Sequence, residues 1–263
     1  MSEFLYNLKK YLTFSGEEIR SMLYIILLYG FILGYNDGYV EFVASRWFFN
    51  LFSSILMAAI IIMTHELGRK VIAIKLGYTA EFRPNWILIG IAFFLGMLSK
   101  GNIALLLPAT GVFITHHERM RIGKFFYGHH YFDNAFIALA GCYANIAVAM
   151  LLKTFSFLPN QEMIVLLMQL SIWYAIFNLL PFDIIFVLFR FEKADLRKHP
   201  APLDGTYMLY ASRVFYVFCI AAIVTTAMLL FNTGILISVI LGIIIAIFTS
   251  IVYGIFRENL TGG

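Results

Sequence analysis

Long apolar runs separated by short polar segments constrain the fold of this chain more than any other feature of its sequence. Of the 263 residues, 61% are hydrophobic and only 13% are charged, whereas a soluble domain carries roughly 25% charged residues. The composition predicts an all-α, polytopic integral membrane protein with about six or seven spans of roughly 20 residues. The apolar runs cover 21–35, 47–63, 86–98, 103–115, 135–152, 163–189, 207–231 and 235–256.

Two neighbouring runs, 86–98 and 103–115, are each too short to span a bilayer comfortably. They form either one long helix or a tight hairpin, which could be re-entrant. The distribution of Lys and Arg separates these alternatives, because basic residues are enriched in cytoplasmic loops. With a cytoplasmic N-terminus and a hairpin, nearly all basic loops fall on the cytoplasmic side, whereas a single pass would place two strongly basic loops outside. The sequence therefore predicts the hairpin.

The chain is expected to form one membrane domain. A polar segment at 1–20 is predicted to lie in the cytoplasm, the membrane domain to cover 21–257, and a short tail to follow at 258–263. The formal net charge of +4 implies no nucleic-acid partner, because basic loops also set membrane topology. Cys142 and Cys219 lie in apolar runs, which favours buried thiols that behave as small hydrophobes over a disulfide.

The most informative motif, His65-Glu66-Leu67-Gly68-Arg69, follows the run at 47–63. In the zinc-protease motif H-E-x-x-H, two His one helical turn apart bind Zn²⁺ and the Glu acts on the metal-bound water. Here Arg69 stands where the second His belongs, and a guanidinium stays protonated and has no lone pair for a metal. A simpler alternative is a chance His-Glu pair near the membrane interface, with Arg69, Lys70 and Lys75 extending toward the lipid headgroups.

Three further segments combine polar residues with Gly or Pro inside or beside apolar runs. They are Ala140-Gly141-Cys142-Tyr143-Ala144-Asn145, Asn178-Leu179-Leu180-Pro181 and Pro202-Leu203-Asp204-Gly205. Each has a simple structural explanation when taken alone. The first suits close helix packing, the second a helix break in the membrane, and the third a turn and helix cap.

Taken in this order, the four motifs resemble those of the site-2 protease family of intramembrane zinc metalloproteases, over roughly residues 14–230. The likeness is closest to the archaeal multi-spanning members. It implies a helical core at about 47–206 and a hydrolase that cleaves transmembrane segments of other membrane proteins within the lipid bilayer. Together with the predicted topology, it also implies a protein of the prokaryotic plasma membrane.

The resemblance further implies roles for single residues. His65 and Asp204 are the expected zinc ligands, and Glu66 is the expected general base. The residues expected to support the site or to hold an unwound substrate are Asn145, Asn178 and Pro181.

Two departures from the family pattern bear on the chemistry. Arg69 replaces one zinc ligand, and the stretch between Pro181 and Asp204 is longer than family members usually have. Asp183 therefore remains an alternative to Asp204 as the metal-binding Asp. His199, in the loop before Asp204, is an alternative source of the missing ligand.

Two functions follow from these observations. The first is an active intramembrane zinc protease that uses His65, Asp204 and a replacement ligand. The second is a pseudoenzyme without a cofactor, in which Arg69 pairs with Glu66 and Asp204 and the scaffold binds transmembrane helices. A transporter or channel ranks below both, because the polar intramembrane residues fall on the protease pattern rather than along a separate pathway.

Overall fold

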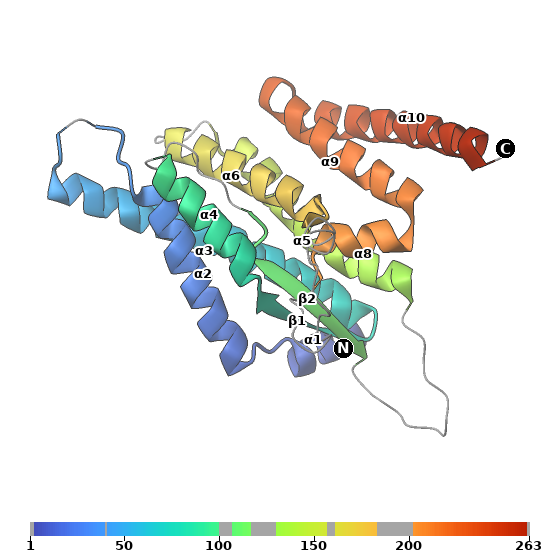
Figure 1. The fold of residues 1–263 in the computed structure, drawn as a ribbon, viewed down its shortest axis with the longest axis horizontal. Coiled ribbons are helices and arrows are strands. Elements are labelled where there is room, and N and C mark those ends of the chain that lie inside the picture. Colours follow the sequence, from blue (N-terminus) through green and yellow to red (C-terminus); the bar gives the residue numbers. More distant parts are fainter. Residues whose placement is uncertain are drawn as a thin grey trace.

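The computed structural model describes residues 3–39, 41–99, 107–116, 130–156, 161–182 and 202–261. Within these residues the chain forms nine helices and one two-stranded sheet (Figure 1). The elements are α1 (Glu3–Tyr11), α2 (Gly16–Gly34), α3 (Ala44–Lys75), β1 (Tyr78–Pro84), α4 (Trp86–Leu98), β2 (Thr110–His116), α5 (Tyr131–Thr154), α6 (Gln161–Leu179), α8 (Asp204–Ala211), α9 (Arg213–Asn232) and α10 (Ile235–Thr261).

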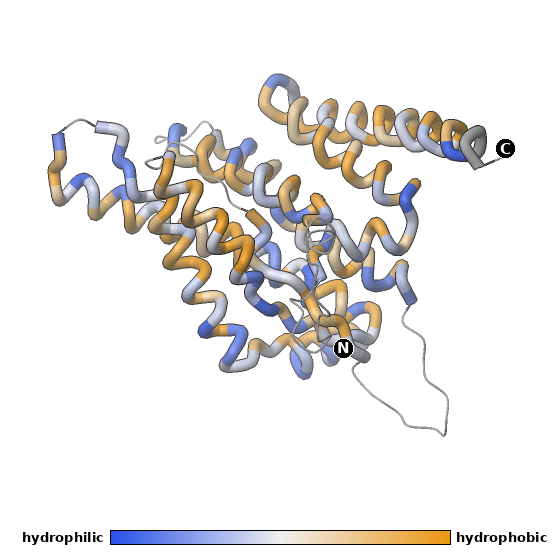
Figure 2. The backbone as a smooth tube through the Cα atoms, in the orientation of Figure 1, coloured by the Kyte–Doolittle hydropathy of each residue, from blue (hydrophilic) through white to orange (hydrophobic). Residues whose placement is uncertain are grey.

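Five of the described helices are long and apolar enough to cross a membrane, which agrees with the predicted helical membrane protein. They are α3, α5, α6, α9 and α10. Hydrophobic residues dominate these helices in Figure 2, and large side chains such as Ile244 and Phe248 on α10 are exposed. An apolar exposed surface of this kind is what contact with lipid requires. The run at 21–35 lies within α2, whose first turn carries Glu17 and Glu18.

The segment 86–115 reverses direction, but its second arm ends in a strand rather than a helix. α4 ends at Leu98 and β2 begins at Thr110. The backbone N–H of Asn85, just before α4, donates to the carbonyl of Ala109, just before β2, over 2.8 Å. The chain thus returns to the point where it left, which excludes a single pass. The strand corrects the purely helical expectation for this segment.

β1 and β2 form an antiparallel pair in which Phe82 lies opposite Val112 and Pro84 opposite Thr110. Alternate residues of β1 are buried, as expected for a strand with one face on a core. β2 is rich in β-branched residues, including Val112 and Ile114, which favour strands. The buried face of the sheet packs against α3 and α5, and this places the start of β2 beside α3.

Two apolar clusters determine how the helices pack. One joins residues of α2, α3, α4 and α6, and the other joins residues of α5, α6, α8 and α9. α10 packs on α9 and lies at the upper right edge of Figure 1, beyond α9. The first turn of α8 lies between the two clusters, because Leu203 belongs to the first and Met208 to the second.

One buried carboxylate, Glu18, ties the start of α2 to α3 and β1. Glu18 forms a capping box with Ser15, an ion pair with Lys70 (2.9 Å) and a hydrogen bond from the backbone N–H of Phe82 (3.2 Å). Lys70 also donates to the carbonyl of Thr13 over 3.0 Å. Lys70 is only 6% exposed, so the interpretation that it extends toward the headgroups is wrong. Its buried partner compensates its charge instead.

A second contact ties the sheet to α5. The hydroxyl of Tyr78, at the start of β1, donates to Oδ2 of Asp133 over 3.0 Å. Burial, followed by this contact with Asp133, raises the pKa of Tyr78 to about 12. Both effects favour the protonated phenol, which is the form that donates to Asp133.

Candidate functional site

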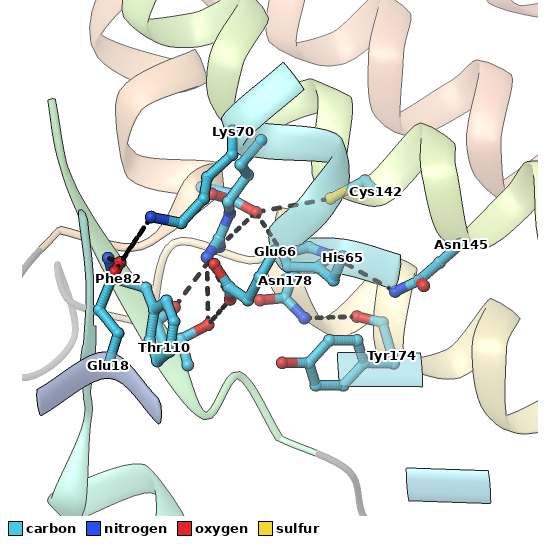
Figure 3. A network of polar contacts seen from close by, with 12 residues as sticks. Glu18, His65, Glu66, Lys70, Phe82, Thr110, Cys142, Asn145, Tyr174 and Asn178 are labelled. Atoms are coloured by element: carbon cyan, nitrogen blue, oxygen red, sulfur yellow. Dashed lines mark hydrogen bonds and ion pairs between the residues drawn. The ribbon is translucent and has the colours of Figure 1, made fainter. Parts of the chain in front are cut away.

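The titratable residues singled out by the motifs meet in one buried cluster. His65, Glu66 and Arg69 lie on α3, whereas Asp204 opens α8, 139 residues after His65. Their exposures range from 0% to 1%. Figure 3 shows the cluster with Thr110 of β2 at its edge. The burial of Arg69 excludes the alternative in which its guanidinium extends toward the headgroups.

Arg69 bridges the two carboxylates of the cluster. Its Nη1 lies 2.8 Å from Oε1 of Glu66, and its Nη2 lies 2.7 Å from Oδ2 of Asp204. Nη1 also donates to Oγ1 of Thr110 (3.1 Å), which in turn donates to the same Glu66 oxygen (2.5 Å). A spacing of three residues places Glu66 and Arg69 on one face of α3. The position of the missing His therefore holds a cation that pairs with both acidic residues.

The ring of His65 lies against α5 and contacts Asp204. Its Nε2 lies 3.0 Å from Oδ2 of Asp204, and its Nδ1 lies 3.4 Å from Nδ2 of Asn145. A neutral imidazole with its proton on Nε2 satisfies both contacts. The ring also makes an edge contact with Tyr174, with centroids 5.2 Å apart. Gly141 permits this arrangement, because a Cβ there would lie 2.7 Å from Cε1 of His65.

The Asn-Leu-Leu-Pro motif lies beside the cluster and shapes its border. Asn178 is buried and donates to the carbonyl of Tyr174 over 2.7 Å. α6 ends at Leu179, and the half-buried Pro181 follows. Gly205 lies against this helix end, because a Cβ there would be 2.1 Å from the carbonyl oxygen of Leu179. This contact between Gly205 and Leu179 places the first turn of α8 against α6, and Asp204 lies in that turn.

Two of the predicted alternatives lie outside the described residues. These are Asp183, the other candidate for the metal-binding Asp, and His199, the candidate replacement ligand. Both stay predictions, whereas Asp204 lies within the cluster.

Cys142 belongs to the cluster, although its sequence context suggested only a small buried hydrophobe. It is buried and carries a free thiol, as predicted, but its Sγ lies 3.8 Å from Oδ2 of Asp204. One metal-ligating atom from each of His65, Cys142 and Asp204 falls within 4.8 Å of the others. One signal in the sequence could have indicated this: Cys142 precedes Asn145 by three residues, so both lie on the same face of α5.

The fit of the cluster to zinc, the cofactor that the resemblance implies, depends on Arg69. Zinc accepts His, Cys and carboxylate ligands, and one of each converges here. However, Oδ2 of Asp204 contacts both His65 and the guanidinium of Arg69. A zinc ion on that oxygen would face the guanidinium charge at close range, with a repulsion on the order of several kcal/mol in a low-dielectric site. With Arg69 in this position, the donor set does not fit zinc.

The comparisons with known proteins add no relative to this picture. No family model, no curated protein and no solved structure matches the chain. The resemblance to the site-2 protease family therefore rests on the four motifs and their order.

Proposed function

We propose that this protein is a site-2-protease-like pseudoenzyme that binds transmembrane segments of other membrane proteins without cleaving them. The observation that carries the proposal is the guanidinium of Arg69, which pairs with Glu66 at 2.8 Å and with Asp204 at 2.7 Å. In a zinc protease of this type, the two carboxylates would act as general base and metal ligand. Here a permanent cation of the chain itself engages both.

An active intramembrane zinc protease is the alternative. The convergence of His65, Cys142 and Asp204 within 4.8 Å favours it. It requires Arg69 to release Asp204 before a metal can bind, which breaks a buried ion pair. Breaking such a pair costs about 3–5 kcal/mol, and this cost favours the pseudoenzyme.

The proposed ligand is a transmembrane helix with a locally unwound backbone. Two amide oxygens, Oδ1 of Asn145 and Oδ1 of Asn178, are buried without a hydrogen-bond partner among the described residues. Buried polar groups are almost always paired, and an unwound segment offers free backbone N–H groups that would pair with them. Both residues occupy positions at which the resemblance implies substrate holding.

The location proposed for the protein is the plasma membrane of a prokaryote, with the N-terminus in the cytoplasm. The basic loops support this orientation through their asymmetry. In this orientation α3 runs toward the cytoplasm, and the cluster at 65–69 lies nearer to its cytoplasmic end.

Zinc content tests the loss of the metal site. We expect detergent-purified wild-type protein to contain no stoichiometric zinc and Arg69→His to contain about one zinc per chain. The exchange removes the competing cation and restores a second imidazole one turn after His65. Arg69→His/Asp204→Ala should lose that zinc, because one ligand is then missing. Elemental analysis of these three proteins and of Asp204→Ala provides the measurement. About one zinc per wild-type chain, lost in Asp204→Ala, would overturn the pseudoenzyme.

Binding of a transmembrane segment can be measured by energy transfer in liposomes. The probes are two labelled synthetic helices of equal length, one of Leu and Ala alone and one with a central Gly-Pro pair. We expect the wild type to bind the Gly-Pro helix more tightly, and Asn145→Ala/Asn178→Ala to weaken that binding about tenfold, as two lost intramembrane hydrogen bonds imply. Asn232→Ala, at an exposed site, is the control. Equal energy transfer for all proteins and both probes would contradict the proposal.

A further inference from the structure

We propose that a cavity between the start of α2 and the end of β1 binds the headgroup of a phospholipid that carries a primary ammonium group, such as phosphatidylethanolamine. The inference goes beyond the binding of transmembrane segments. It does not rest on that function either, because none of the residues that carry it belongs to the buried cluster around Arg69.

The cavity forms where the first turns of α2 meet the second half of β1. It has a volume of about 240 Å³, and its lining includes Glu17, Glu18 and Ser21 on one side and Glu81, Arg83 and Pro84 on the other. Sites for drug-sized ligands occupy roughly 300–1,000 Å³. This cavity is smaller than those sites and suits a polar group of headgroup size.

Glu18 holds the two walls of the cavity together. Its carboxylate accepts a hydrogen bond from the backbone N–H of Phe82 over 3.2 Å and pairs with Lys70 at 2.9 Å (Figure 3). The charge of Glu18 is therefore compensated within the protein. The same contacts fix the start of α2 beside β1, so the cavity lies between two elements that are tied to each other.

Three other charged side chains line the cavity without an internal counter-ion. Glu81 and Arg83 are two residues apart and share the exposed face of β1, and Glu17 is exposed on α2. Among the described residues, none of these three forms an ion pair. Arg83 instead lies over the ring of Phe113, 4.8 Å from its centroid. Two carboxylates and one guanidinium thus remain available to a ligand.

The cavity lies at the level where two apolar surfaces begin. α2 exposes a stripe of large apolar residues at a spacing of four, which starts in its first turn, and α4 exposes two more at its start. They are Ile19, Leu23 and Leu27 on α2, and Trp86 and Ile87 on α4, with exposures from 46% to 57%. In a membrane protein such surfaces face lipid chains, and Trp is enriched at the membrane interface. The cavity therefore lies at the depth of the headgroups.

The charges of the lining match a headgroup that carries both an ammonium and a phosphate. A guanidinium binds phosphate oxygens with paired N–H donors, as Arg83 would do here. A primary ammonium has three N–H donors for the carboxylates of Glu17 and Glu81. The quaternary ammonium of choline has none and is usually bound by aromatic rings. Phe82, which also lines the cavity, is only 3% exposed and provides no such cage.

Lipid titrations of the full-length protein, followed by native mass spectrometry, test the ammonium contact. The probes are phosphatidylethanolamine and phosphatidylcholine with identical acyl chains. We expect the wild type to bind its first ethanolamine lipid about tenfold more tightly than its first choline lipid, because only the former donates to the carboxylates. Glu17→Gln/Glu81→Gln should abolish this preference. Glu162→Gln, at an exposed site on α6, is the control and should retain it.

Arg83→Gln tests the phosphate contact. It should weaken the binding of both lipids by about tenfold and leave their ratio unchanged, because both carry the same phosphate. Soluble glycerophosphoethanolamine distinguishes a lipid from a free headgroup. It should not displace the lipid at equal concentration, because it lacks the chains that would lie on α2 and α4. Displacement at equal concentration, or an ethanolamine preference that survives Glu17→Gln/Glu81→Gln, would overturn the inference.

Labelling in nanodiscs locates the bound headgroup. Ser21 lines the cavity, and the two native thiols are buried, so Ser21→Cys provides a selective site for a water-soluble maleimide. We expect labelling to be several-fold slower in nanodiscs of ethanolamine and choline lipids in equal parts than in nanodiscs of choline lipid alone. Ser156→Cys, at an exposed site, should react at the same rate in both. Equal rates for Ser21→Cys would overturn the assignment of the headgroup to this cavity, whatever the outcome of the tests of the proposed function.

Discussion

Arg69→Met is expected to destabilise the folded protein by about 3–5 kcal/mol, the cost of removing one partner from a buried ion pair. Arg69 has 0% exposure and is the cation that Glu66 and Asp204 share. Methionine preserves much of the side-chain volume. The lost stability would therefore come from the two carboxylates left without a counter-ion rather than from a cavity. The measurement is the free energy of unfolding in mixed micelles of detergent and SDS, followed by circular dichroism.

A double-mutant cycle shows whether the loss comes from charge. Glu66→Gln/Arg69→Met removes one stranded carboxylate, so we expect it to recover at least about 1 kcal/mol of the loss, as coupled neighbours do. The matched control is Arg46→Met, because the Arg46 side chain is 34% exposed and pairs with Asp37 at 2.9 Å. Because this pair is only partly buried, with the Asp37 side chain 10% exposed, its loss should cost less than the loss of a fully buried pair. If Arg69→Met cost no more than Arg46→Met, Arg69 would not be the counter-ion of the cluster.

The local part of the site could be predicted from the sequence, because helical spacing alone determines it. A helix over the His-Glu motif places Glu66 and Arg69 on one face, and the structure contains their ion pair. The contact between His65 and Asp204 could not be predicted from helical spacing. No periodicity links residues that are 139 positions apart, so only the order of the motifs suggested that Asp204 approaches His65.

The position of Cys142 beside Asp204 was missed because its signal depends on packing. A thiol between Gly141 and other small residues is typical of a helix interface, and a buried Cys most often acts as a small hydrophobe. Its nearness to Asp204 arises because α5 lies close to both His65 and the first turn of α8. Two helices from distant parts of the chain must therefore be placed before the approach of Cys142 to Asp204 can be recognised.

The sheet and the Glu18–Lys70 pair were missed for a similar reason. In a chain of apolar runs, the run at 103–115 suggests helix, and its β-branched residues are a weaker signal. The pairing partner of β2 is β1, a short segment in which alternate residues are buried. Lys70 suggested an interfacial residue because its partner, Glu18, lies on another helix. The apolar runs indicate which segments enter the membrane but not which polar groups meet.

Gly205→Ala is expected to destabilise the protein by about 1–3 kcal/mol, the usual cost of overpacking a well-packed site. The new Cβ would lie 2.1 Å from the carbonyl oxygen of Leu179. Because both sides of the contact are backbone, neither can move away by changing a rotamer. The first turn of α8 would have to move instead, and Asp204 with it. We therefore expect Arg69→His/Gly205→Ala to lose the zinc that Arg69→His binds.

Gly254→Ala is the matched control, because this glycine lies on α10 and a Cβ there would have no described atom within 4 Å apart from the backbone of its own helix. Alanine is the better helix former by up to about 1 kcal/mol, so Gly254→Ala should be neutral or slightly stabilising and should not affect zinc binding. If Gly205→Ala were equally harmless, α8 would not be held against the end of α6. The close contact at Gly205 is our explanation for the position of the Asp204 carboxylate between the guanidinium of Arg69 and the imidazole of His65. A harmless Gly205→Ala would show that this contact does not determine the position of Asp204.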